Sequence, residues 1–270
     1  WKSRLLRGLY IRTLEHISGD MVEENRAERI NHAKEHLKEI LADWLPEDLE
    51  KHISIGHPHY WLSYDGDTHI RHAKLIQKAK TQNKNLHIET RIDEEFEYSE
   101  ITIYAPDHPG LFSEIAGVMA LFSVNIVNAK IVTLSDGMVL DTFSFLDAND
   151  QAVTDPEKLT KIILQIEDAL SGKVELASNI TKARENKRTK EQETFVVASR
   201  VIINNQASST DTIIEVNGSD RIGLLYDITA ALTKLGLRIS SSHITTFGEE
   251  VVDTFYVKDV FGLKITHKEK

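Results

Sequence analysis

The sequence predicts an α+β fold, in which a helical segment over residues 1–95 is followed by two copies of a smaller unit at residues 98–205 and 211–270. Three observations support this prediction. Apolar residues in the first ninety positions recur at helical spacing, and strand-like alternation begins near residue 97. The pattern after that point then returns at a shift of 113 residues.

The first segment has the apolar spacing of short helices. Residues spaced three and four apart predict a helix over 5–17, which stops at 18–20, where Ser, Gly and Asp follow one another. Pro46 ends a second helix predicted over 21–44, and shorter helices are predicted over 48–53 and 69–79. Together they would form a small bundle or part of a larger one.

The first unit reads strand, helix, strand, strand, helix, strand. Its expected elements are strand 101–105, helix 111–122, a hairpin of 125–134 with 138–146, helix 156–170 and a closing strand 195–204. That order favours an antiparallel sheet with helices on one face, a ferredoxin-like βαββαβ arrangement. A mixed-charge run at 182–191 is interpreted as a solvated helical connector and not as a binding patch.

The second unit repeats the first through strand, loop, helix and hairpin. The positions that recur at a shift of 113 are Ile101, Ile103, Asp107, Gly110 and Leu111, which match Ile214, Val216, Asp220, Gly223 and Leu224. The second hairpin is one residue shorter, after which Asp-Thr-Phe at 141–143 matches the same triplet at 253–255. A register kept through these elements indicates a true duplication. Because the sequence stops at Lys270, we expect the second unit to be incomplete.

Composition argues against several classes of protein. Lys and Arg total 32 against 42 Asp and Glu, a formal charge of -10, whereas a nucleic-acid surface needs a concentrated basic excess. The chain has no cysteine, so disulfides and Cys-based zinc sites are excluded. No apolar run approaches the roughly 18–20 residues of a membrane span. We therefore expect a cytoplasmic protein whose partners include neither nucleic acid nor a membrane.

Each unit has a related turn between its first strand and its helix, Asp-His-Pro-Gly at 107–110 and Asp-Arg-Ile-Gly at 220–223. A helix N-terminus presents unpaired N–H groups and partial positive charge, which favour a bound carboxylate. Glycine there removes the Cβ that would keep a ligand away from the backbone. One such turn could be only an Asp cap with a tight bend. Its recurrence in the same frame favours a ligand-binding turn.

The duplicated turn inside a duplicated β-α-β-β frame resembles the ACT domain family, whose members bind small ligands, usually amino acids, often between paired modules. A closer resemblance covers essentially the whole chain. Stretches 106–117, 124–131 and 136–143 resemble the first ACT module of the bacterial bifunctional PII uridylyltransferase/uridylyl-removing enzymes. Stretches 220–227, 242–246 and 252–257 resemble their last module, and 1–10, 60–62 and 69–72 resemble the helical region before the pair.

This resemblance implies a regulatory region in which the ACT pair senses glutamine. In that family a nucleotidyltransferase domain adds uridylyl groups to the PII signal protein, and a metal-dependent HD domain removes them. The chain has neither a Gly-Ser dipeptide followed by paired Asp residues nor a His-Asp dipeptide, so we expect no catalytic or metal-binding residue in it. Magnesium is expected only with catalytic domains upstream, and residues 1–95 would be the end of the HD part. The resemblance also allows self-association through the ACT modules.

The residues expected to bind the ligand come from the two turns and from the strand after each helix. They are Asp107, His108, Gly110, Leu111, Asn125, Ile126, Asp220, Arg221, Gly223, Leu224, Arg238 and Ile239. Asp141 and Asp253 lie in strands among apolar residues, so each contacts either a ligand ammonium or a cap or interface donor. The 12 histidines show no H-E-x-x-H pattern, so His32, His36 and the four between 57 and 72 are interpreted as surface or packing residues.

Two other functions fit the same residues. The ACT pair could serve another enzyme of amino-acid metabolism with a different effector, or it could join subunits without any ligand. The helical resemblance speaks against the first alternative. A bulky replacement of Gly110 or Gly223 would distinguish the second, because only a sensor would lose its effector response while dimerisation persists. A free-standing phosphohydrolase would need metal and activity from residues 1–95, and the missing His-Asp pair argues against it.

Overall fold

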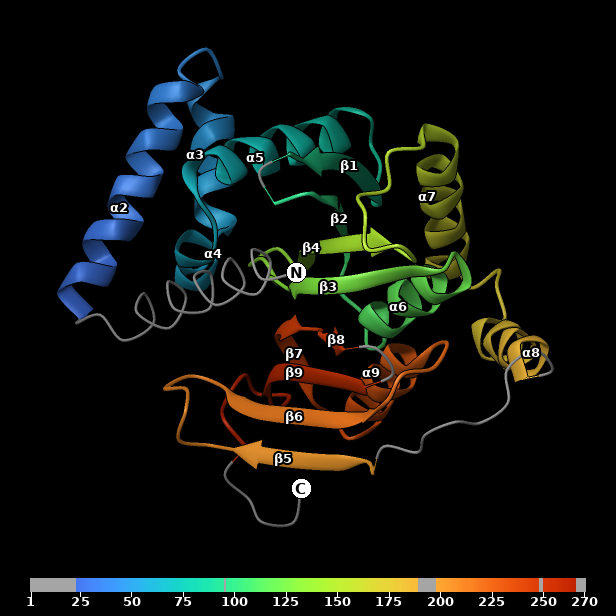
Figure 1. Ribbon diagram of the computed structural model, residues 1–270. Helices are drawn as coiled ribbons and strands as arrows, with labels where there is room; N and C mark the ends of the chain where they lie inside the picture. Colours follow the sequence, from blue (N-terminus) through green and yellow to red (C-terminus); the bar gives the residue numbers. More distant parts are fainter. Residues whose placement is uncertain (1–22, 95, 189–197, 248–249, 266–270) are drawn as a thin grey trace.

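Four helices precede the sheet in the computed structural model, which describes residues 23–94, 96–188, 198–247 and 250–265 (Figure 1). These helices are α2 (Glu23–Ile40), α3 (Pro46–Ile55), α4 (Pro58–Ser63) and α5 (Gly66–Thr81). The helix expected over 5–17 lies outside the described residues. The helix expected over 21–44 ends earlier, at Ile40, and a turn follows it. Helix α4 was not predicted, because its six residues are too few to show a helical period.

The remaining elements form two units. The first contains β1 (His87–Asp93), β2 (Tyr98–Pro106), α6 (Leu111–Leu121), β3 (Val124–Lys130), β4 (Met138–Asp147) and α7 (Pro156–Leu170). Helix α8 (Leu176–Arg188) lies between the units. The second contains β5 (Arg200–Asn204), β6 (Thr212–Ser219), α9 (Leu224–Lys234), β7 (Arg238–His243), β8 (Thr246–Phe247) and β9 (Glu250–Lys258). The prediction of an α+β fold is confirmed.

The strands form one antiparallel sheet in the order β1-β2-β4-β3-β7-β9-β6-β5, with β8 paired to β9. Residues 195–204 were expected to close the sheet of the first unit, and this prediction is wrong. The strand in this segment is β5, and it pairs with β6 of the second unit. Strand β1, which was not predicted, takes the corresponding place beside β2 in the first unit. Each unit therefore begins with an antiparallel hairpin, β1–β2 or β5–β6.

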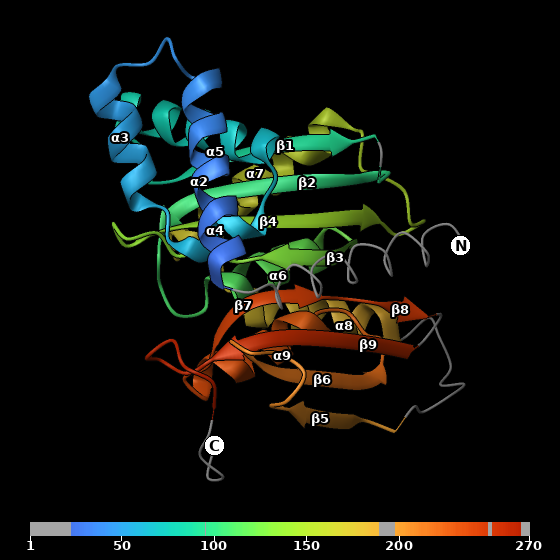
Figure 2. The same cartoon turned by 90° about the vertical axis from the view of Figure 1, so that its left-hand side faces the viewer.

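The two units meet edge to edge through β3 and β7 (Figure 2). Three residue pairs define this seam, Asn128 with His243, Ala129 with Ser242 and Lys130 with Ser241. Backbone hydrogen bonds extend it at both ends, from Ile131 N–H to the Ser240 carbonyl (2.9 Å) and from Ile244 N–H to the Val127 carbonyl (3.1 Å). The pairing joins the strands of both units into one continuous sheet, which has nine strands in the described residues.

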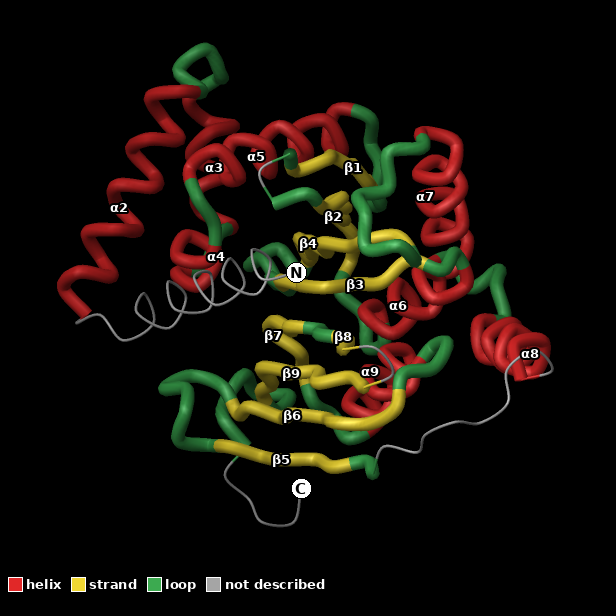
Figure 3. Tube along the Cα trace, viewed as in Figure 1, coloured by secondary structure: helices red, strands yellow, loops and turns green. Residues whose placement is uncertain are grey.

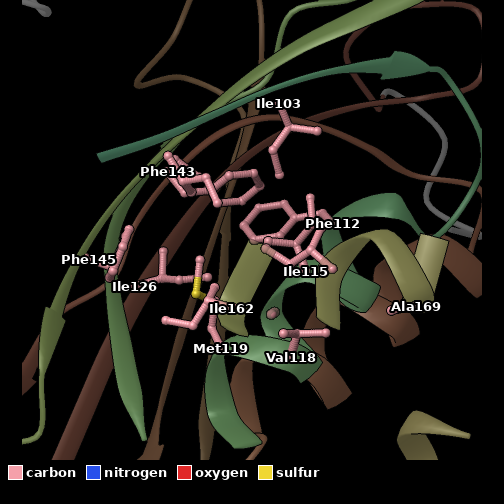
Figure 4. Packing of buried hydrophobic residues seen from close by; sticks show 14 of the residues in the cluster. Ile103, Phe112, Ile115, Val118, Met119, Ile126, Phe143, Phe145, Ile162 and Ala169 are labelled. Atoms are coloured by element: carbon pink, nitrogen blue, oxygen red, sulfur yellow. The ribbon is translucent and has the colours of Figure 1, made fainter. Parts of the chain in front are cut away.

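Helices α6, α7, α8 and α9 gather along one side of the strands (Figure 3). In the first unit, Phe112 and Ile115 of α6 and Ile162 of α7 pack against Ile103 and Phe143 of the sheet (Figure 4). These side chains belong to the largest buried cluster. Alternation along β2 and β4 places every second residue in this core, but the expectation of a single buried face is wrong for these strands, because nearly all of their residues are buried.

Coverage of the helical side differs between the units. The first unit has α6 and α7 over its strands, whereas in the described part of the second unit α9 is the only helix of its own. Val201 and Ile203 of β5 consequently remain 61% and 62% exposed, although they pair with the core strand β6. The second core is correspondingly small, with five buried residues, one of which is Phe255.

The opposite face of the first unit is covered by the N-terminal helices. Tyr104 of β2 and Leu140 of β4 point into a second cluster with Leu37, Tyr60 and Ile76. His52, His69 and His72 are also buried beside this cluster, and burial lowers the pKa of all three. Helix α4 is tied to the seam strand β3, because Lys130 Nζ donates to the Ser63 carbonyl (2.8 Å). The helical segment therefore packs on the first unit of the pair.

Candidate functional site

The first turn connects β2 to α6, with its glycine in the left-handed region. Gly110 has φ 98°, which an L-side chain rarely adopts, so this position favours glycine. Asp107 is exposed at the surface, and its Oδ2 accepts a long hydrogen bond from Thr133 Oγ1 (3.5 Å). His108 Nε2 lies 4.0 Å from Glu114 Oε2, and burial raises the pKa of Glu114. Two acids therefore flank the start of α6: Asp107 of the loop before it and Glu114 of its first helical turn.

The second turn repeats this backbone before α9. Gly223 has φ 71°, Asp220 and Arg221 are exposed, and Arg221 Nη1 forms an ion pair with Asp227 Oδ2 (2.5 Å). Asp227 also accepts from Arg184 Nη2 (2.8 Å), and Arg184 belongs to α8. The second turn is therefore surrounded by two arginines, whereas His108 stands at the position of Arg221 in the first.

A buried aspartate lies beside each turn. Asp141 is 1% exposed and Asp253 is 2% exposed. Burial raises the pKa of Asp141 well above its usual value, and it raises the pKa of Asp253 to about 7. The turn aspartates Asp107 and Asp220 add to these shifts through charge repulsion. The role of Asp141 and Asp253 as ammonium contacts stays a prediction. Because both side chains are buried, a ligand would have to enter the protein to contact either of them.

The backbone environment of the buried aspartates is the same in both copies. Asp141 Oδ1 accepts from Val132 N–H (3.4 Å), and Asp253 accepts from the backbone of Thr245. Thr245 lies 113 positions after Val132, which is the shift of the repeat. The duplication thus includes a carboxyl group and its backbone donor in addition to the turn. A sequence signal for this was present in the repeated Asp-Thr-Phe triplet.

The seam brings the predicted strand residues to the turn of the opposite unit. If the antiparallel register continues beyond the Ile131–Ser240 hydrogen bond, Arg238 stands opposite Thr133, whose hydroxyl donates to Asp107. Ile239 packs against the cores of both units. At the other end of the seam, the same course carries Asn125 toward the residues around Thr245. Arg238 and Ile239 therefore lie on the side of the first turn, and Asn125 and Ile126 lie on the side of the second.

Within its own unit, Asn125 lies far from the turn. It pairs with Leu146, whereas the turn follows Pro106, which pairs with Met138. The eight positions of β4 between Met138 and Leu146 span about 27 Å at the usual rise of a strand. Asn125 could therefore approach a turn only across the seam, at the second unit.

Not every predicted residue can offer its side chain to a ligand in this arrangement. Leu111 and Ile126 are buried in the core of the first unit, at 4% exposure each. The backbone of Leu111 still forms the start of α6. The side chain of Leu224 is half-buried at the start of α9. These residues position the turns through packing.

Two residues of α8 at the second turn were missed by the sequence reasoning. Arg184 Nε donates to the Ile222 carbonyl (2.8 Å), and Ile180 is buried against Gly223. In the described part of the run, which ends at Arg188, the connector is helical and Lys182, Glu185 and Asn186 are exposed as predicted, whereas Arg184 packs on the turn and departs from the prediction. Ile180 offered a weak signal, because it is an apolar residue on the turn of helix before the charged run.

The described residues contain neither a metal cluster nor a membrane-spanning helix. No group of three or more His, Cys, Asp or Glu side chains is placed to hold a metal ion in that part of the chain. None of the helices there is long and apolar enough to cross a membrane.

Comparisons with known proteins agree with this architecture. A sequence model described as the ACR family N-terminal ACT domain matches residues 207–269, which form most of the second unit. The bifunctional uridylyltransferase/uridylyl-removing enzyme of Azospirillum brasilense is 45% identical over the whole chain, which corresponds to 29% of that enzyme. Enzymes of the same name from Rhodospirillum rubrum and Gluconobacter oxydans are 42% and 41% identical over 100% and 98% of the chain.

The chain spans about 29% of the length of these relatives. Their similarity covers the helical segment and both units, so it includes more than a shared ACT fold. With its ACT-type ferredoxin-like units, the chain belongs to the family of the bifunctional uridylyltransferase/uridylyl-removing enzymes.

Proposed function

We propose that this chain is the glutamine-sensing regulatory region of an enzyme that uridylylates and deuridylylates the PII signal protein. The observation that supports the proposal is the register of the seam: Asp107 of the first turn accepts a hydrogen bond from Thr133, which lies two residues beyond Ile131, and the Ile131 N–H donates across the seam to the Ser240 carbonyl of β7. A ligand held there would contact both units, so its binding would favour one arrangement of the pair over another.

The first turn has the chemistry that an amino acid needs. The N-terminus of α6 favours a carboxylate through its N–H groups and helix dipole. The exposed carboxylate of Asp107 is suited to an ammonium group, and Gly110 leaves the backbone accessible to a close approach. Arg238 is exposed at the start of the strand beside the turn and adds a donor for a side-chain amide oxygen.

A route from the seam to the helical segment is also present. Lys130 pairs with Ser241 across the seam and donates to the Ser63 carbonyl at the end of α4. Its ammonium also lies 5.1 Å from the centre of the Tyr64 ring, within range of a cation–π contact. A change in the seam would therefore reach α4 through one side chain.

The catalytic chemistry is proposed for the rest of the enzyme. The relatives are named for uridylyl transfer and removal, and this chain matches about 29% of their length. The active sites, their magnesium and the PII contacts would belong to the other domains of a cytoplasmic enzyme. Self-association through the ACT units belongs to the same proposal.

Titration calorimetry with glutamine and a panel of other amino acids tests the sensor function. We expect glutamine to bind and the Asp107→Asn variant to bind at least tenfold more weakly, as expected for a lost charge-assisted contact of about 1.4 kcal/mol or more. Asp43→Asn, at an exposed position in the helical segment, is the matched control. Failure of glutamine to bind the folded chain would contradict the proposal.

Two alternative outcomes have clear signatures. Preference for a different amino acid would assign the pair to another enzyme of amino-acid metabolism. Analytical ultracentrifugation of wild type and Gly110→Leu measures association of the chains. Association without an effector response would indicate a dimerisation module that binds no ligand.

A further inference from the structure

Helix α8 lies directly against the second turn. Ile180 is 1% exposed, and a Cβ built on Gly223 would lie 2.6 Å from Ile180 Cγ2. A Cβ on Gly117 of α6 would lie 3.3 Å from Ile180 Cδ1. Ile180 therefore fills the space between the helix of the first unit and the turn of the second. The backbone of Gly223 is consequently covered by protein.

Arg184 fastens α8 to the same turn. Its Nε donates to the Ile222 carbonyl (2.8 Å), and its Nη2 donates to the Gly223 carbonyl (3.2 Å) and to Asp227 Oδ2 (2.8 Å). The turn thus holds a guanidinium from its own chain through three acceptors. Such charge-assisted, multidentate contacts are among the stronger polar interactions in proteins.

The first turn has no such cover among the described residues. A Cβ built on Gly110 would find one atom within 4 Å, Ser113 Oγ at 3.6 Å, and that residue belongs to the same helix end. Gly110 is half-buried whereas Gly223 is buried. The two turns share a conformation, and one of them is filled by α8.

We propose that α8 is an intramolecular plug of the second turn, so that each chain offers one turn, the first, to an amino-acid ligand. Release of Ile180 and Arg184 would expose the second turn as a further site. This inference rests on the proposed sensor function for its ligand, but the plug itself is a property of the protein without ligand.

Amide hydrogen exchange on the 270-residue chain tests the plug without any ligand. In the Arg184→Ala variant we expect amides 222–227 to exchange roughly tenfold faster than in wild type, because three hydrogen bonds to the turn region are lost. Amides 110–114 of the first turn serve as the internal control. Lys182→Ala, an exposed position on the same helix, should leave both turns unchanged. Unchanged exchange at 222–227 in Arg184→Ala and in the double variant Ile180→Ala/Arg184→Ala would overturn the plug.

Calorimetry with glutamine on the same variants tests the site count. We expect one glutamine per chain in wild type and two in the double variant, with circular dichroism confirming that it is folded. Two equivalent sites in wild type, or one site in a double variant whose second turn exchanges fast, would overturn the inference. If no variant binds glutamine, the sensor function fails, and the plug is then decided by the exchange measurement alone.

Discussion

At the first turn a side chain added to Gly110 would approach only the Ser113 hydroxyl, whereas at the second turn a side chain added to Gly223 would collide with Ile180. Both glycines begin helices of equal length in the same fold, so the turns themselves do not explain the difference. The connector does. A tandem pair has two turns and a single connecting helix, and α8 packs on one turn only. Duplication therefore produced equal turns in unequal surroundings.

The buried aspartates allow a test of a feature common to both turns, a carboxyl group whose pKa is raised by burial. Burial holds the pKa of Asp253 near 7, so the unfolded chain releases this proton near pH 4 and the folded chain keeps it. Stability from this group is therefore lost as pH rises from about 4 through 7, by up to about 4 kcal/mol. Asp253→Asn should remove that loss, as measured by urea unfolding at several pH values.

Asp141→Asn should change the slope in the same direction, because burial also raises the pKa of Asp141. Asp43→Asn is the control for a surface carboxyl. If the free energy of unfolding changes with pH in the same way for wild type and for both aspartate variants, a raised pKa of Asp141 and Asp253 is refuted.

The packing of α8 tests the difference between the turns. Truncating Ile180 to Ala removes a fully buried side chain and leaves a cavity between α6 and the second turn, which should cost about 2–4 kcal/mol. Leu164→Ala on the exposed side of α7 should cost less than about 1 kcal/mol. Chemical denaturation of the two variants measures this contrast. Equal losses would mean that α8 does not pack on the turn in solution.

Matched glycine substitutions test the turns themselves. Gly110→Ala and Gly223→Ala each place a Cβ at a positive φ, which costs about 1–2 kcal/mol. Gly223→Ala must also displace Ile180, so its loss of stability should be the larger. Thermal unfolding compares the pair. A larger loss for Gly110→Ala would show that backbone strain, and not α8, distinguishes the turns.

The smallest expected effect concerns an ion pair of the connector region that does not touch a turn. Lys173 Nζ lies 3.0 Å from Asp168 Oδ1, and both side chains are exposed. Its removal in Lys173→Ala should change stability by less than about 0.5 kcal/mol. Arg184→Ala should cost about 1–3 kcal/mol in the same assay, because its partners include two backbone carbonyls. Similar values for the two would place Arg184 among ordinary surface charges.

The sequence was sufficient for the parts of the molecule that repeat. The turn, helix and hairpin of each unit follow from local patterns that occur twice, and α7 was predicted at its observed bounds. Strand β1 was missed although Ile88 and Ile92 alternate with charged residues, and the same shift of 113 places it on β5. The repeat therefore includes the hairpin at the start of each unit.

The contacts between elements could not be predicted in the same way. Arg184 reads as one charge in a mixed run, and its carbonyl partners lie 38 and 39 residues away. The seam depends on which two strand edges meet, and neither β3 nor β7 carries a local mark of its partner. The ligand-binding role of the turn residues remains a prediction for the same reason, because it depends on groups from two units.

The seam also has a consequence for the edges of the sheet. Pairing β3 with β7 removes one open strand edge from each unit, which leaves β1 and β5 as the outer strands of the described sheet. Charged side chains on an edge strand discourage the addition of a foreign strand, and β1 carries Glu89, Arg91 and Asp93. Strand β5 carries only Arg200 beside its exposed Val201 and Ile203. Within the described sheet, the edge that belongs to the second unit is therefore less protected against the addition of a foreign strand.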